Sequence, residues 1–491
     1  MNYCTPEAAG ISSADVLKFY QKLESWGLST HDVIIARGNS IFTESYYAPF
    51  TKDFKHRMYS VSKSFVSVAI GFCEQDGLLS LDDPFSKFFP ELMREGVAVK
   101  ASSVTVREML RMESGIMEGE RWFSFDNGDR AAIYLDRKIQ EKYPNTLFDY
   151  DSFGSYMLGV IVEKLTGKPF LEYLKDKVLR DIGFSEDSYC LQAPGGYSWG
   201  DSGVMCTAQD LLLFARFVLN GGTWNGKRYL NEAYLKLATT PSVCNNPYGF
   251  VWPGGYGYGY QFWGLAKGCY AMFGMGIQLA ICDPVHDLVF IINSDNQGNI
   301  ITYTPIVYTF YDYIFDKLQD TALPEDREAH ARLVEYTSRL SLFKLGGSTE
   351  SPMLDRVQGK IYRAEKNPMG IEWFSLNRDG DETVFCYENA QGRKALRLGF
   401  GKNVFQKFPE EGYSDMVGAT FAPGNYYDCA VSADWPEERT LRVRVQIIDK
   451  YFGNLSILFG FRDENHVSVR MQKTAEDFLD EYCGMMNANA E

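Results

Sequence analysis

Residues 58–65 of this 491-residue chain read MYSVSKSF, and the prediction of the fold starts from this stretch. Ser60 and Lys63 stand three positions apart, so a helix places their side chains on one face, one turn from each other. The pattern predicts a helix from Ser60 to Gln75, and free backbone N–H groups at its N-terminus favour anionic species. A serine hydroxyl becomes an effective nucleophile when a base takes its proton, and a lysine with a lowered pKa can be that base.

This spacing alone is weak support for catalysis, because serine and lysine are common residues. Ser341 and Lys344 repeat the spacing in a charged segment, and Ser60 also suits an ordinary helix N-cap. Residues 200–203, GDSG, resemble the nucleophile site of chymotrypsin-like proteases, but the chain lacks the double β-barrel pattern and the upstream histidine context of that mechanism. The surrounding sequence therefore has to decide between these interpretations.

Further landmarks follow Ser60 in order along the first 320 residues. They read GLLSLDDP at 77–84, VTVREML at 104–110 with ESG at 113–115, GVMCTAQD at 203–210 and LNGG at 219–222. Together with the Ser60 stretch, they resemble the serine β-lactamase and DD-peptidase (penicillin-binding protein-like) superfamily, nearest to class C β-lactamases and their esterase relatives. The resemblance implies a serine hydrolase that works through a covalent acyl-enzyme, with Ser60 as the nucleophile.

The second motif of that superfamily, Tyr-x-Asn, corresponds to residues 150–152, which read YDS. The resemblance implies that Tyr150 acts with Lys63 as base and proton shuttle, since a nearby ammonium group lowers the pKa of a phenol. Ser152 stands where the family has asparagine. It keeps a hydrogen-bond donor and acceptor but loses the reach of the amide.

The third motif, Lys-Thr-Gly or His-x-Gly on a sheet strand, corresponds to residues 273–278, which read FGMGIQ. Met275 takes the place of the lysine or histidine, and Ile277 stands where the family has glycine. A methionine offers no charge to a substrate carboxylate, which weakens the expectation of β-lactam or D-Ala-D-Ala recognition. The resemblance implies an oxyanion hole formed by the backbone N–H groups of Ser60 and Gln278, which does not depend on the side chain at 275.

The pattern of elements predicts an α/β (α+β) domain of the β-lactamase/transpeptidase type over residues 1–340. β-Rich runs at both ends and a mostly helical middle favour an antiparallel sheet flanked by helices, plus a helical subdomain. The charged stretch 321–350 is predicted to be the boundary. Beyond it, residues 350–491 have turns at hairpin spacing, which predict an all-β antiparallel sandwich or barrel of unknown role. Specific expectations within the first domain are helices over 12–26, 152–165 and 208–219, and a strand over 258–263.

Composition limits the partners of the chain. Hydrophobic residues make up 45% and charged residues 23%, with a formal charge of −15, which argues against nucleic acid or an anionic membrane surface. The start of the chain has no signal-peptide pattern, and no apolar run reaches about 18 residues, so a cytoplasmic protein is expected. The histidines and cysteines show no metal-ligand spacing, and neither a metal nor a cofactor is expected. The oligomeric state stays open.

We therefore predict a serine hydrolase acting on the carbonyl of a small-molecule ester, amide or peptide. The alternatives are a β-lactamase or DD-peptidase proper, a catalytically silent penicillin-binding-like protein that binds a ligand, and a chain whose C-terminal β-rich region is a binding or oligomerisation module. The changed second and third motifs favour esters or amides over β-lactams. The candidate residues are Ser60, Lys63 and Tyr150 for catalysis, and Ser152, Met275, Gly276 and Gln278 for substrate and oxyanion contacts.

Overall fold

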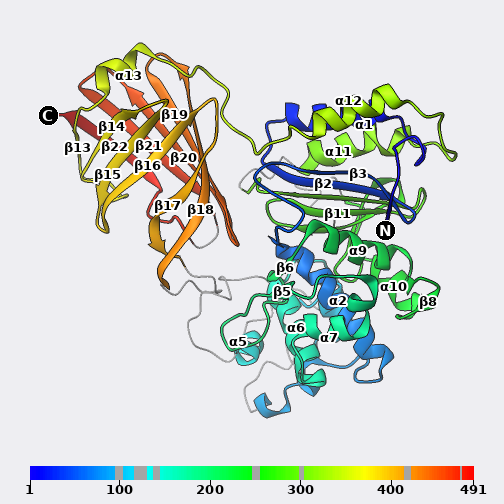
Figure 1. Cartoon of the computed structure of the whole chain (residues 1–491). Coiled ribbons are helices and arrows are strands. Elements are labelled where there is room, and N and C mark those ends of the chain that lie inside the picture. The colour runs from blue at the N-terminus through cyan, green and yellow to red at the C-terminus, as the bar shows by residue number, and fades with distance from the viewer. Residues whose placement is uncertain are drawn as a thin grey trace. The chain divides into compact units, whose positions relative to one another are not determined.

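A computed structural model describes residues 1–93, 103–115, 130–136, 144–245, 255–297, 303–413, 422–475 and 478–491. The chain divides into two compact units, one running from Met1 to Ser341 and the other beginning at Leu342. The first unit combines a sheet with helices, and the second is almost wholly β (Figure 1). The predicted fold class is confirmed for both parts.

The described residues of the first unit contain a seven-stranded sheet whose neighbouring strands are antiparallel, except for the first pair. The strand order is β1 (Asn2–Tyr3), β3 (Ser40–Tyr46), β2 (Thr30–Arg37), β12 (Leu288–Ser294), β11 (Gln278–Asp283), β10 (Tyr270–Gly274) and β9 (Trp263–Gly264). β2 and β12 are adjacent, with Ile34 opposite Ile291. The two ends of the segment therefore build the sheet together, as the sequence predicts.

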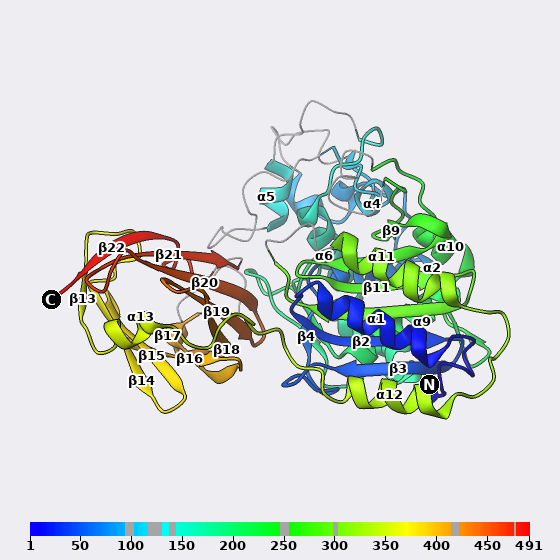
Figure 2. The same ribbon diagram turned by 90° about the horizontal axis from the view of Figure 1, so that it is seen from above.

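Helices lie on both faces of this sheet (Figures 1 and 2). On one face α1 (Ser13–Ser25) packs against α11 (Tyr303–Tyr313) and α12 (Arg327–Thr337), and on the other α9 (Ala208–Leu219) packs on β2, β11 and β12. The ring of Phe290 on β12 contacts Phe19 of α1 and Phe310 of α11, with centroids 5.8 and 4.9 Å away. These aromatic contacts fix the two helices on the sheet.

The other helices of the unit surround α2 (Ser62–Gln75), which contacts α6 (Ser152–Thr166), α7 (Phe170–Leu174) and α10 (Glu232–Thr239). Every residue of α2 from 62 to 73 is buried, as befits a helix without a solvent-facing side. Other short elements of the unit are β4 (His56–Arg57), the 3₁₀ turn η1 (Tyr59–Val61), α4 (Val106–Leu110), α5 (Arg130–Asp136), α8 (Arg180–Ile182), β5 (Tyr189–Cys190), β6 (Val204–Cys206), β7 (Thr223–Trp224) and β8 (Lys227–Arg228).

The helices expected over 12–26, 152–165 and 208–219 are confirmed as α1, α6 and α9. The strand expected over 258–263 is wrong, because only β9 forms at its end. Gly259 approaches the helix α10 so closely that a Cβ would stand 2.0 Å from a carbonyl oxygen, and Gln261 has a φ of +64°. Both features break the alternation that a strand requires.

The charged segment 321–350 contains α12, a helix that the sequence did not predict. Its buried residues are Ala329 and Leu333, so its apolar stripe is narrow and its charged residues face outward. A pattern this polar is hard to tell from a linker by periodicity alone.

The described residues of the second unit form a ten-stranded sheet, and β16 and β18 pair in parallel to close it into a barrel. Of the sandwich and the barrel predicted, the barrel is present. A short helix, α13 (Pro352–Val357), precedes the strands. They are β13 (Tyr362–Ala364), β14 (Trp373–Asp379), β15 (Glu382–Asn389), β16 (Gly392–Phe400), β17 (Val404–Gly412), β18 (Ala422–Glu437), β19 (Thr440–Ile448), β20 (Phe452–Phe461), β21 (His466–Thr474) and β22 (Gly484–Ala490).

A buried polar group lies inside the second unit. The hydroxyl of Tyr482 donates to Glu410 Oε2 at 2.8 Å and lies 2.7 Å from the Tyr387 hydroxyl, while Lys394 Nζ is 3.2 Å from Glu410 Oε1. Only 1% of Glu410 is exposed. The carboxylate therefore depends on these partners instead of water.

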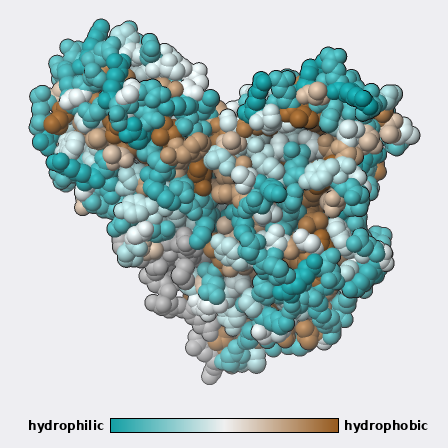
Figure 3. Space-filling model, in the orientation of Figure 1, coloured by the Kyte–Doolittle hydropathy of each residue, from teal (hydrophilic) through white to brown (hydrophobic). Residues whose placement is uncertain are grey.

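On the face shown in Figure 3, hydrophilic residues cover most of each unit and apolar residues form small separate patches. Among the described residues, no helix combines the length and the apolar character needed to cross a membrane.

Tyr482→Phe is expected to lower the free energy of unfolding by about 1–3 kcal/mol, because the buried Glu410 and Tyr387 each lose a hydrogen-bond partner. Chemical denaturation measures the change. Tyr426→Phe is the control, since that side chain is exposed, and it should change stability by less than about 0.5 kcal/mol. Equal stability of the two variants would show that the buried group contributes nothing.

Candidate active site

The three serines of the first motif have different surroundings. Ser62 Oγ accepts the Val204 N–H at 3.0 Å, and Ser64 Oγ donates to the Gln261 carbonyl at 2.7 Å; both serines are fully buried. Ser60 lies in η1, immediately before α2, and is half-buried. The fold thus uses Ser62 and Ser64 to hold the helix in place and leaves Ser60 as the accessible hydroxyl.

Lys63 lies directly beside this hydroxyl. Its Nζ is 2.9 Å from Ser60 Oγ and 3.0 Å from the carbonyl oxygen of Asp201, and Asp201 Oδ2 is 3.9 Å away. Only 2% of Lys63 is exposed. These protein groups therefore take the place of water around the buried amine.

Tyr150 is the third member of this group. The centroid of its ring lies 5.0 Å from Lys63 Nζ, and the ring stacks on Trp263 with centroids 5.6 Å apart. Trp263 in turn contacts the rings of Tyr258 and Phe148. The structure thus brings the three predicted catalytic side chains to one place, with an aromatic wall behind Tyr150.

The second motif marks the start of α6. Asp151 is the N-cap: its Oδ1 accepts the Gly154 N–H at 2.9 Å, and its Oδ2 accepts the Ser114 hydroxyl at 3.1 Å. Ser152 is the first residue of the helix and is half-buried. Tyr150 is therefore held just outside a capped helix terminus, a position with little backbone freedom.

The third motif forms the turn between β10 and β11. The Ile277 N–H donates to the Gly274 carbonyl at 3.1 Å, and Gly276 and Ile277 have φ values of +75° and +73°. Such a φ is rare for isoleucine and is kept only when the surroundings enforce it. The buried side chain of Gln278 supplies part of this enforcement, since its Nε2 donates to the carbonyls of Ser294 and Met275 at 2.7 and 3.1 Å.

Within this turn region, Gly274 is the residue that meets the nucleophile segment. A Cβ at position 274 would lie 2.2 Å from the Met58 carbonyl oxygen and 3.2 Å from the Ser60 nitrogen. Met275 is half-buried on the turn, and Gly276 is tied to the end of β12 through its carbonyl, which accepts the Ser294 hydroxyl at 2.7 Å. The absence of a side chain at 274 lets the end of β10 touch the backbone that carries Ser60.

The residue before Ser60 is strained. Tyr59 has a φ of +46°, which non-glycine residues seldom adopt. The guanidinium of Arg57 lies 4.2 Å from the Tyr59 ring centroid and 4.0 Å from that of Trp199, and it donates to the carbonyl and hydroxyl of Ser202 at 3.1 Å each. This buried cation holds the strained turn against the loop that contains Asp201.

Two residues of the site were not predicted from the sequence. Asp201 contacts Lys63 across 138 positions, and only the GDSG stretch drew attention to it, for another chemistry. Gln261 joins the two helices of the site: its carbonyl accepts from Ser64 on α2, its Oε1 accepts the Ser155 hydroxyl of α6 at 2.8 Å, and its Nε2 donates to the Leu110 carbonyl at 2.8 Å.

A buried histidine pair links β2, which carries His31, to β4, which carries His56. His56 Nε2 lies 3.2 Å from His31 Nδ1, and His56 Nδ1 lies 3.5 Å from Asp32 Oδ2. Burial lowers the pKa of His56 to about 3 and raises the pKa of Asp32 well above its usual value. Burial also lowers the pKa of His31 well below its usual value, so both histidines are neutral at physiological pH. Across the described residues, His, Cys, Asp and Glu form no group of three or more that is arranged to hold a metal ion.

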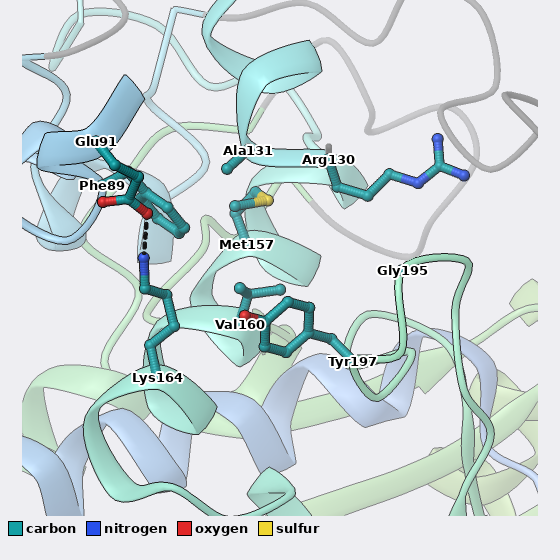
Figure 4. Close-up of a pocket in the computed structure, with 9 residues that line it drawn as sticks. All are labelled: Phe89, Glu91, Arg130, Ala131, Met157, Val160, Lys164, Gly195 and Tyr197. Carbon is teal, nitrogen blue, oxygen red and sulfur yellow. Dashed lines mark hydrogen bonds and ion pairs between the residues drawn. The ribbon is translucent and has the colours of Figure 1, made fainter. Parts of the chain in front are cut away.

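A pocket of about 190 Å³ lies elsewhere in the helical part of this unit (Figure 4). Met157 and Val160 of α6 line it, and none of the three catalytic candidates does. Lys164 Nζ is 2.7 Å from Glu91 Oε1, and the guanidinium of Arg130 points away from Met157 and Val160. Lys164 and Glu91 thus pair with each other, and Arg130 is directed away from the pocket. The pocket therefore offers little to a charged ligand.

Comparisons with known proteins support the family resemblance of the first unit. Residues 24–300 match the family model described as Beta-lactamase. The chain is 27% identical over 294 residues to the 6-aminohexanoate-dimer hydrolase of Paenarthrobacter ureafaciens, covering 55% of this chain and 73% of that protein.

Solved structures resemble the fold. A penicillin-binding protein homologue from Caulobacter crescentus has a TM-score of 0.50 at 15% identity, over 64% of this chain and 99% of that chain. A protein named SurE has a TM-score of 0.50 at 15% identity, over 92% of this chain and 95% of that chain. At these identities the likeness concerns the fold alone.

Gly274→Ala is expected to slow the reaction of Ser60 with a fluorophosphonate about 100-fold or more, because the added methyl group displaces the Ser60 backbone. The measurement is the second-order labelling rate, with thermal unfolding recorded in parallel. Gly346→Ala is the matched control, since nothing lies within 4 Å of its added Cβ. Native labelling rates in both variants would show that the close approach of β10 is irrelevant to the site.

Proposed function

This chain belongs to the beta-lactamase family, and we propose that it is a serine hydrolase that forms a covalent acyl-enzyme on Ser60. The observation that carries this proposal is the 2.9 Å contact between Lys63 Nζ and Ser60 Oγ, with the Tyr150 ring 5.0 Å from the same nitrogen. Ser60 and Lys63 are one helical turn apart, and the ring of Tyr150, from a distant part of the sequence, lies beside them. Nucleophilic catalysis requires such an activated hydroxyl.

In the proposed reaction, Ser60 Oγ forms a bond to the substrate carbonyl carbon while its proton passes to the Tyr150–Lys63 pair. The tetrahedral intermediate collapses when the bond to the leaving group breaks, and the same pair returns the proton to the leaving atom. Water then attacks the acyl-enzyme and releases the acid, regenerating the Ser60 hydroxyl. The proton lost by Ser60 reaches the leaving group of the substrate, and the proton lost by water reaches Ser60 Oγ. The site therefore returns to its starting state.

The negative charge of the tetrahedral intermediate needs hydrogen-bond donors. We assign this role to the backbone N–H groups of Ser60 and Gln278, as the resemblance implies. Two features support the assignment: Ser60 lies at the N-terminal end of α2, and the end of β10 touches its backbone. The donors belong to the backbone, so Met275 does not prevent their action.

The proposed substrates are small esters or amides. The relative from Paenarthrobacter ureafaciens is named a 6-aminohexanoate-dimer hydrolase. Met275 stands on the turn where the resemblance places a cation, and Ser152 replaces the amide of the second motif. Both changes remove groups that would hold a charged or strongly polar substrate. A neutral acyl group needs no charged partner at these two positions, and the stacked rings of Tyr150 and Trp263 offer it an apolar surface.

A fluorophosphonate is expected to label Ser60 in the native protein, as a Ser60 Oγ–phosphorus bond replaces the phosphorus–fluorine bond. Ser60→Ala should abolish the label and the turnover of p-nitrophenyl esters. Ser341→Ala is the matched control, because Ser341 and Lys344 have the same spacing, and it should leave both unchanged. Peptide mass spectrometry locates the label. Tight binding of an ester without turnover or labelling would favour the silent ligand-binding alternative.

Met275→Lys is expected to improve the hydrolysis of an ester with a terminal carboxylate, relative to a neutral ester of equal length. A half-exposed ion pair contributes roughly 1 kcal/mol, so the ratio of the two kcat/KM values should rise about fivefold. Met275→Leu supplies the control for changed packing. The same ratio in both variants would show that position 275 does not face the substrate.

A further inference from the structure

The Asp201 carboxylate is the unexpected charge of the site. Its Oδ2 lies 3.9 Å from Lys63 Nζ, while its backbone carbonyl accepts from the same nitrogen at 3.0 Å. Only 4% of Asp201 and 2% of Lys63 are exposed. Two opposite charges this close, and this well shielded from water, interact strongly.

We propose that Asp201 is a positioning residue that holds Lys63 as an ammonium ion, and that this charged form is the one that works. In the proposed form Tyr150 starts as a phenolate, and its oxygen takes the hydroxyl proton of Ser60 as the bond from Oγ to the carbonyl carbon forms. The ammonium group donates to Ser60 Oγ and offsets the charge of the phenolate. On collapse, that proton moves from Tyr150 to the leaving atom. This inference rests on the proposed function. It makes Tyr150 the group that takes the proton and Lys63 the group that supplies the positive charge.

The burial of Lys63 is the first reason for this assignment. An isolated ammonium group in a protein interior loses its hydration and tends to give up its proton. A carboxylate at hydrogen-bonding or near-hydrogen-bonding distance reverses that tendency. Asp201 therefore opposes the deprotonation that a lysine acting as general base would require.

The other titratable groups around this pair do not replace Asp201. Arg57 is engaged by Ser202, next to Asp201 in the chain. Burial raises the pKa of Tyr156 and of Cys190, both of which sense the Asp201 charge, so these groups stay protonated and neutral. Glu163 lies near the C-terminal end of α6, and its Oε1 accepts the Phe170 N–H at 3.1 Å. Burial also raises the pKa of this carboxyl group. Of these carboxylates, Asp201 is the one that reaches Lys63.

The test is the pH dependence of Ser60 labelling by a fluorophosphonate in the full-length protein. With Asp201→Asn the anion is lost, so Lys63 should release its proton at lower pH. The alkaline limb of the profile should move down by about one to three pH units. Glu163→Gln, which removes a nearby carboxylate that does not contact Lys63, should leave the limb in place.

Lys63→Arg keeps the test decisive if Asp201→Asn does not fold. A guanidinium stays charged throughout the accessible pH range, so this variant should retain measurable labelling and lose the alkaline limb. Complete loss of labelling in folded Lys63→Arg would overturn the inference. An unmoved alkaline limb in folded Asp201→Asn, or a downward shift of the acid limb instead, would do the same. Failure of the native protein to label at all would reject the proposed function itself, which is a different result.

Discussion

The close approach of β10 to the backbone of residues 58–60 is the constraint on which the candidate site depends. Gly274 touches the backbone of Met58 and Ser60, and it joins the central sheet to the N-terminal end of the buried helix α2. A side chain at 274 would separate the two elements. The strained φ of Tyr59 and the stacking of Arg57 on its ring maintain the contact from the other side. Strain at such a junction persists because the surrounding packing over-determines it.

Local patterns explain what the sequence could predict. Ser60 and Lys63 are neighbours through helix geometry alone, and their 2.9 Å contact needs no information from the rest of the chain. The same holds for α9, expected over 208–219, which begins at a capping box of Thr207 and Asp210. Tyr150 was reached by resemblance, because no local rule ties it to residues 87 positions earlier.

The features that escaped prediction depend on distant partners. Asp201 meets Lys63 only after the loop before β6 folds onto α2, and Gln261 acts through contacts with three separate helices. The chain around Gln261 also failed to form the expected strand, because Gly259 has to pass close to α10. In each case tertiary contact overrides the local preference, and a single sequence carries no sign of the contact.

The charges around Ser60 bear on the neutral substrates proposed for this site. Within the described residues, Lys63 is matched by Asp201, and Arg57 is enclosed by Ser202 and two aromatic rings. Met275 adds no charge at the turn, and the chain as a whole carries a formal charge of −15. A carboxylated substrate would therefore approach a negative molecule and find its nearest cations already engaged. A neutral acyl group avoids both costs, and the aromatic wall beside Tyr150 offers it apolar contact instead.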